Sequence, residues 1–132
     1  MDSRIAPGIP KMIDYWVSVD EIIDVVCTQI NNKRVTREAV KSPSREKPLP
    51  FARAMSVMMA REFIPMYMAT HEDIMSYFNR DRSTYYTTKK VWENTWMRYP
   101  AEKNLSQVVH KIIEMKIRER RDHAKLSENQ EK

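Results

Sequence analysis

The stretch of the chain richest in reactive side chains runs from residue 79 to residue 90 and reads NRDRSTYYTTKK. Guanidinium groups such as those of Arg80 and Arg82 can donate two hydrogen bonds to guanine, and a carboxylate such as that of Asp81 can accept one from the cytosine amino group. Hydroxyl groups can bond bases or phosphates, and ammonium groups can hold a phosphate backbone. For these roles the stretch supplies Ser83, Thr84, Thr87, Lys89 and Lys90. An alternative is that Asp81 only caps a helix and that the arginines are ordinary solvent-exposed residues that keep the surface soluble.

Two helices joined by a short turn are predicted to position these residues. Thr70, with the acidic Glu72 and Asp73 in the turn that follows it, has the pattern of a helix start. That helix is expected to end at Phe78, because Asn79 readily takes the left-handed backbone conformation that terminates helices. Asp81 is expected to cap the next helix, whose core-facing residues are Tyr85, Thr88, Trp92 and Trp96. Two helices in this order are typical of a helix-turn-helix, whose second helix enters the major groove of DNA.

The segments before this pair also follow the helical period. A capping box of Ser18 and Glu21 is expected to begin a helix that ends at Asn31. A single helical turn is expected over residues 36–40. A further helix is predicted over residues 51–64, ending before a proline. Its apolar face consists of Ala52, Met55, Met59, Phe63 and Met66.

The last predicted helix begins at Asn104 and turns an apolar face inward. That face consists of Leu105, Val108, Val109, Ile112 and Ile113. No segment alternates with the period of a strand, so we expect an all-α fold of five or six short helices that contains the helix-turn-helix. We divide the chain into a flexible arm (residues 1–16), a helical domain (17–118) and a polar tail (119–132) that is expected to fray.

A proline-rich segment, KSPSREKPLP, occupies residues 41–50. Its three prolines disfavour both helix and central strand, so we expect an exposed loop. Residues 33–53 carry seven basic and two acidic groups, a net charge of +5 that equals the net charge of the whole chain. This concentration of positive charge favours an anionic partner.

Composition argues against several classes of protein. Gly8 is the only glycine, which excludes the glycine-rich loops of nucleotide-binding motifs. Cys27 is the only cysteine and falls on a predicted apolar face, so it is read as a core residue in a chain suited to the cytoplasm. The three histidines, His71, His110 and His123, are scattered along the sequence. We expect His71 to be only a solvent-exposed residue in the first turn of a helix. We therefore expect no enzyme, no metal, no cofactor and no membrane span.

The stretch HEDIMSYFNRDRSTYYTTKKVWEN, residues 71–94, resembles the C-terminal DNA-binding domain of the bacterial replication initiator DnaA. The family pattern is close to L-P-E-I-G-x-x-F-G-x-R-D-H-S/T-T-V-x-x-A-x-x-K-I. The resemblance extends to VSVDEIIDVVC (residues 17–27) and to KSPSREKPLPFARAMSVMMAREF (residues 41–63), which is similar to the basic loop and following helix of that family. The resemblance implies a Trp-repressor-like all-α fold.

The resemblance also implies roles for individual residues. Arg45 would enter the minor groove, with Lys47 beside it, and Asp81, Ser83 and Thr84 would read the major groove. Arg80 would contact DNA or brace the turn, and Lys41 and Arg53 would contact phosphates. This chain departs from the family pattern at Asn79, Arg82 and Thr87.

The function expected from this resemblance is sequence-specific binding of double-stranded DNA. A recognition helix (residues 79–92) would lie in the major groove and a basic segment (41–53) in the minor groove. The chain lacks a nucleotide-binding motif, so we expect a free-standing module in the control of replication or transcription, or in a phage or mobile element. The alternative is a protein-interaction module with only non-specific affinity for DNA. Its helix over Leu105–Ile117 would pair with another protein or a second copy, unless that face only closes the core.

Overall fold

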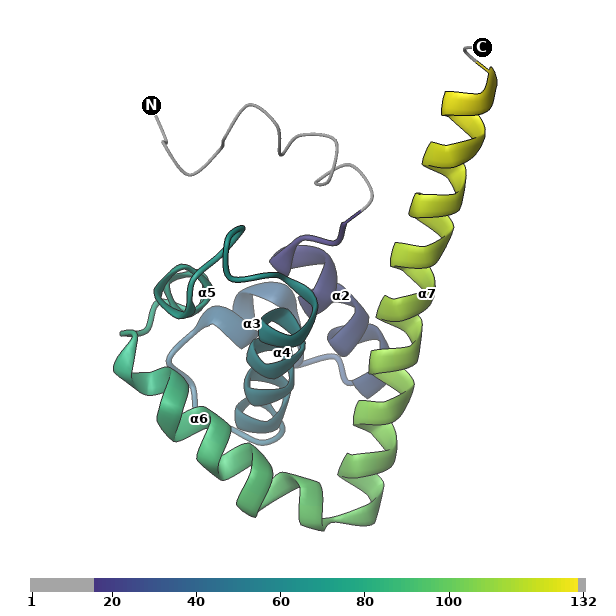
Figure 1. Ribbon diagram of the computed structural model, residues 1–132. Coiled ribbons are helices and arrows are strands. Elements are labelled where there is room, and N and C mark those ends of the chain that lie inside the picture. Colours follow the sequence, from purple (N-terminus) through teal and green to yellow (C-terminus); the bar gives the residue numbers. More distant parts are fainter. Residues whose placement is uncertain (1–15, 131–132) are drawn as a thin grey trace.

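Six α-helices and one short 3₁₀ helix form the regular structure of residues 16–130, the part of the chain that the computed structural model describes (Figure 1). No strand occurs among these residues, which confirms the all-α expectation. Residues 1–15 of the predicted arm lie outside the described residues. In chain order the elements are α2 (Val19–Ile30), α3 (Arg37–Lys41), α4 (Leu49–Phe63), α5 (His71–Tyr77), α6 (Ser83–Asn94), the 3₁₀ helix η1 (Trp96–Arg98) and α7 (Pro100–Gln130).

Local capping signals explain where α2 and α5 begin and end. The predicted capping box at α2 is present: the amide of Glu21 donates to Ser18 Oγ at 3.1 Å, and the amide of Ser18 donates to Glu21 Oε1 at 3.2 Å. Asn31 ends α2 in the left-handed conformation, with φ of 53°. Thr70 caps α5 as predicted, and Asn79 beyond its end also has a positive φ, of 56°.

Helix α4 lies at the centre of the fold and contacts α2, α3, α5 and α6 (Figure 1). Met55 and Val57 of α4 and Ile22 of α2 are fully buried in a single apolar core. Val109 and Ile113 of α7 close that core along one side. Cys27 packs against the same core, and burial raises the pKa of its thiol, as expected for a packing residue.

The start of α6 differs from the prediction. The helix begins at Ser83, and the side chain of Asp81 makes no capping bond; the N-cap residue is Arg82, in helical backbone conformation. Backbone carbonyls, rather than a side-chain cap, accept from two amides in the first turn of α6. The amide of Thr84 donates to the carbonyl of Asp81 and that of Tyr85 to the carbonyl of Arg82, each at 3.0 Å.

Helix α7 is longer than the sequence suggested. It begins at Pro100 rather than Asn104, because proline is well suited to the first position of a helix, where its missing amide hydrogen costs nothing. It continues to Gln130 through the segment that was expected to fray. Its second half extends past the other helices, as Figure 1 shows in yellow.

Two side chains predicted to face inward, Met66 and Val108, are exposed, and so is Tyr77. Met66 is 54% exposed because α4 ends before it, so the helical register no longer applies. Tyr77 is 44% exposed, and Lys41 Nζ lies 5.1 Å from the centre of its ring. Val108 is 46% exposed because it is one position away from the buried line of Val109 and Ile113 on α7.

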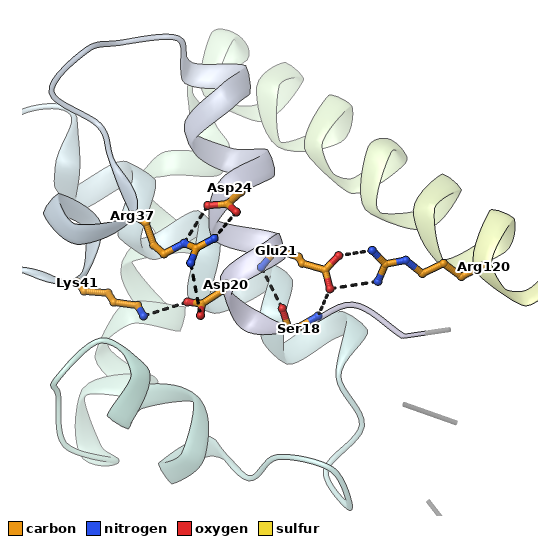
Figure 2. A network of polar contacts seen from close by, with 7 residues as sticks. All are labelled: Ser18, Asp20, Glu21, Asp24, Arg37, Lys41 and Arg120. Atoms are coloured by element: carbon orange, nitrogen blue, oxygen red, sulfur yellow. Dashed lines mark hydrogen bonds and ion pairs between the residues drawn. The ribbon is translucent and has the colours of Figure 1, made fainter. Parts of the chain in front are cut away.

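Two groups of polar contacts join the helices at α2 (Figure 2). Arg120 of α7 donates to both carboxylate oxygens of Glu21, and this hydrogen bonding lowers the pKa of the Glu21 carboxyl. In the second group of contacts, Arg37 Nε donates to Asp24 Oδ1 at 3.0 Å. Lys41 Nζ lies 2.9 Å from Asp20 Oδ1. The end of α3 is therefore fixed to α2.

Candidate nucleic-acid interface

One groove separates the loop between α3 and α4 (residues 42–48, here the basic loop) from helix α6. Its volume is about 960 Å³. Arg45 and Ser42 of the basic loop line one side, Thr87 and Val91 of α6 line the other, and Arg53 of α4 also faces it. The two segments that the sequence assigned to DNA contact thus lie on either side of the same groove, although about 40 residues of chain separate them.

Serine hydroxyl groups shape the basic loop. Ser42 Oγ donates to the carbonyl of Ala39 at 2.6 Å and accepts from the amide of Ser44 at 3.3 Å. Ser44 Oγ accepts from the amide of Glu46 at 3.2 Å. These side-chain turns satisfy backbone groups that neither helix nor sheet can satisfy in a segment rich in proline. Arg45 is left exposed.

Arg53 holds the basic loop from the inside. Its Nε donates to the carbonyl of Val40 at 2.8 Å, and its Nη2 donates to the carbonyls of Ser42 and Ser44 at 2.7 and 3.0 Å. The residue is only 9% exposed. Burial, together with the charge of nearby Arg80, lowers the pKa of the Arg53 guanidinium to about 10, so it stays charged at neutral pH. The sequence suggested only a phosphate contact for this residue.

Arg80 connects the turn before α6 to the same loop. Its Nη1 donates to the carbonyl of Phe78, and its Nη2 donates to the carbonyl of Ser42 at 3.1 Å. Asn79 Nδ2 donates to the carbonyl of Lys41 at 3.4 Å, a weaker second link. The sequence left two roles open for Arg80, a contact with DNA or a brace for the turn. The structure contains the hydrogen bonds of the second role. These bonds fix the start of α6 relative to the basic loop.

The predicted DNA-binding residues differ in accessibility. Arg53 is buried, and Lys41, Arg80 and Thr84 are half-buried. Helix α6 buries Tyr85 and Trp92 against the core, which turns the opposite face outward. The exposed members of the set are Arg45, Lys47, Asp81, Arg82, Ser83, Thr87, Lys89 and Lys90.

Five of the exposed cations make no ion pair with any residue in the described part of the chain: Arg45, Lys47, Arg82, Lys89 and Lys90. Lys41, by contrast, is already paired with Asp20. Of these five cations, Arg45 lines the groove, together with Arg53 and Arg80. Their positive charge creates a local potential that attracts an anion.

His71 has a structural role that the sequence did not reveal. Its ring stacks on that of Tyr85 with centroids 3.9 Å apart, and its Nδ1 lies 3.1 Å from Arg61 Nη1. Because arginine can only donate, Nδ1 must accept, which requires a neutral ring whose proton is on Nε2. Burial and the charge of Arg61 lower the pKa of His71, with smaller contributions from Arg82 and Lys89. The neutral ring therefore holds the start of α6 against α5.

Comparisons with known proteins add no relative: no family model, curated protein or solved structure matches the chain. Among the described residues, no three or more His, Cys, Asp or Glu side chains are grouped so that they could hold a metal ion. No helix in that part of the chain is long and apolar enough to cross a membrane. The geometry of the groove is therefore the basis for a functional proposal.

Proposed function

We propose that this protein binds double-stranded DNA in a sequence-specific manner, with α6 in the major groove and the basic loop in the adjacent minor groove. The observation that carries this proposal is the shared groove, with Arg45 on one side and Thr87 on the other. Adjacent major and minor grooves of a duplex are separated by a single sugar-phosphate strand. Two elements on either side of one groove can follow that strand on both sides.

The first turn of α6 supplies groups that suit the edges of bases. Asp81 and Ser83 are exposed at its start, and Thr87 follows one turn later on the same face. A carboxylate can accept from cytosine, a hydroxyl can bond several bases, and a threonine methyl can contact the thymine methyl. Lys90, one further turn along, is placed to hold a phosphate.

The basic loop supplies the group that suits a narrow minor groove. Arg45 is exposed and has no partner among residues 16–126, while the backbone beneath it is held by Arg53 and by serine hydroxyl groups. A·T-rich sequence narrows the minor groove and strengthens its negative potential, which favours an inserted arginine. We propose that one side of the DNA site is A·T-rich.

The same assignment follows from the resemblance to the DnaA C-terminal domain. We propose that the chain acts as a DNA-binding module of that kind in the control of replication or transcription. The departures at Asn79, Arg82 and Thr87 lie in or beside the element that would read bases. We therefore propose a DNA site that differs from that of the family.

Selection of binding sites from random duplex DNA at about 150 mM salt tests this function. We expect an enriched motif of roughly 8–10 base pairs with an A·T-rich side. With ~4–6 phosphates neutralised, the logarithm of the association constant should fall with the logarithm of salt at a slope near −4 to −5.

A matched control is Lys111→Ala, which removes an exposed charge of α7 that does not line the groove. This variant should select the same motif as the unaltered protein. No enrichment, together with binding that vanishes as salt rises, would contradict the proposal. The alternative, a protein-interaction module that uses the exposed Val108 and Met115 of α7, would then be preferred.

A further inference from the structure

The groove beside α6 is lined by several cations and, among the described residues, by no carboxylate. The cations are Lys41, Arg45, Arg53 and Arg80. Lys41 is neutralised by Asp20, whose Oδ1 lies 2.9 Å from Lys41 Nζ. The three arginines bond only to backbone carbonyls or have no partner within residues 16–126. A positive charge therefore remains at the groove without an anion to balance it.

Two of these arginines converge on one atom. Arg53 Nη2 and Arg80 Nη2 both donate to the carbonyl oxygen of Ser42, at 2.7 and 3.1 Å. Two guanidinium groups that share an acceptor repel one another, and both are partly removed from water. Burial, with the charge of Arg80, lowers the pKa of Arg53 to about 10. An anion next to both groups would remove this repulsion.

Donors remain available for such an anion. Arg53 Nη1 and Arg80 Nε make no hydrogen bond within the described part of the chain. The Arg53 residue is 9% exposed and lines the groove, so a ligand in the groove lies next to it. The planar fork of a guanidinium matches the oxygens of a phosphate. Thr87 and Thr88, across the groove, add hydroxyl groups.

We infer that Arg53 and Arg80 form a binding site for a single phosphate group, supplied by the DNA strand that passes between the basic loop and α6. The identity of this ligand as DNA rests on the proposed function. Arg53 then has two roles: its Nε and Nη2 hold the loop, and its Nη1 binds the phosphate. The phosphate site fixes the register of the duplex relative to both reading elements.

Titration of the protein alone with inorganic phosphate, at constant ionic strength, tests the site without DNA. We expect saturable changes in the NMR amide signals of Asn79, Thr87 and Thr88, which line the groove. Thr28 and Gln29, which line a separate groove between α2 and α7, serve as the internal control and should not change. The absence of a saturable change at the first three residues would overturn the inference.

Two variants distinguish the phosphate site from the proposed minor-groove contact of Arg45. Arg80→Lys keeps the charge but loses the fork, and should weaken phosphate binding about tenfold, the effect of losing a hydrogen bond to a charged group. Arg45→Ala should bind inorganic phosphate as the unaltered protein does while losing affinity for DNA. Equal phosphate affinity of Arg80→Lys and the unaltered protein would contradict the assignment.

A scan of single methylphosphonate substitutions in the selected DNA site identifies the source of the phosphate. We expect one position where neutral substitution weakens binding about tenfold in the unaltered protein but little in Arg80→Lys. Phosphate binding by a protein that selects no DNA site would contradict the proposed function and the assignment to DNA. A protein that selects a DNA site but binds no free phosphate at the groove would overturn the phosphate site alone.

Discussion

Arg53 of α4 and Arg80 of the turn before α6 donate hydrogen bonds to the same carbonyl oxygen, that of Ser42 in the basic loop. The central helix of the core, the loop and the start of α6 are thereby joined at one atom. Neither arginine needs to contact a base for this arrangement to matter. It holds the two proposed DNA-contacting elements at a fixed separation.

Replacement of the buried arginine should lower stability. Arg53→Met leaves the carbonyls of Val40, Ser42 and Ser44 without the donor that satisfies them. We expect the free energy of unfolding to fall by about 3 kcal/mol, measured by urea denaturation. Lys47→Met, at an exposed position of the same loop, should change it by less than about 0.5 kcal/mol. Equal effects of the two changes would show that Arg53 does not hold the loop.

Signals carried by neighbouring residues were sufficient to predict most helix boundaries. The capping boxes at Ser18 and Thr70 depend on residues three positions apart, so the sequence displays both partners. The left-handed Asn79 is likewise a local preference. The incorrect prediction at Asp81 also concerns local contacts, because its backbone carbonyl, and not its side chain, accepts from the amide of Thr84.

Contacts between distant segments were not predictable in this way. The residues that hold the basic loop include Arg80, which lies 38 positions from Ser42. The extension of α7 is accompanied by the contact of Arg120 with Glu21, 99 positions away. His71 looked like a solvated residue because the sequence does not show that Tyr85 stacks on it. Single-sequence periodicity identifies which face is buried, but not which polar groups meet there.

If Arg45 enters the minor groove, its removal should lower both the affinity for DNA and the preference for A·T pairs. Arg45→Ala should weaken binding to the selected site and reduce discrimination between A·T and G·C pairs on one side of it, because the arginine senses groove width. Lys47→Ala, two residues away and equally exposed, should weaken binding evenly on all sequences. Fluorescence anisotropy with both duplexes measures these effects. If Arg45→Ala still discriminates between A·T and G·C pairs as the unaltered protein does, Arg45 does not bind in the minor groove.

The major-groove role of Thr87 predicts a change confined to one base pair. Thr87→Ala should lower discrimination at a single position by ~1–3 kcal/mol and leave the other positions as they were. Thr87→Ser keeps the hydroxyl, so a loss that persists in this variant would identify the methyl group as the reader. Glu93→Ala, also exposed on α6, is the control. A uniform loss across all sequences would assign Thr87 to the phosphate backbone instead.

The half-buried ring of His71 predicts a loss of stability in mild acid. Its pKa is lowered from 6.5 in the folded protein, so the unfolded chain binds a proton more readily. Stability should therefore fall as pH drops below about 6.5, when protonation breaks the contact of Nδ1 with Arg61. Thermal denaturation at a series of pH values measures this. His71→Gln should flatten the stability profile below about pH 6.5, and His123→Gln, at an exposed position, should not.

The claim that the loop and the helix read opposite grooves is tested most directly by inosine substitution in the selected site. An inosine–cytosine pair has the minor-groove edge of A·T and the major-groove edge of G·C. Replacing the A·T pairs on the Arg45 side by inosine–cytosine should leave affinity nearly unchanged. The same replacement at an A·T pair read by α6 should weaken binding. If inosine–cytosine on the Arg45 side weakens binding as much as G·C does, the basic loop does not read the minor groove and the central claim is wrong.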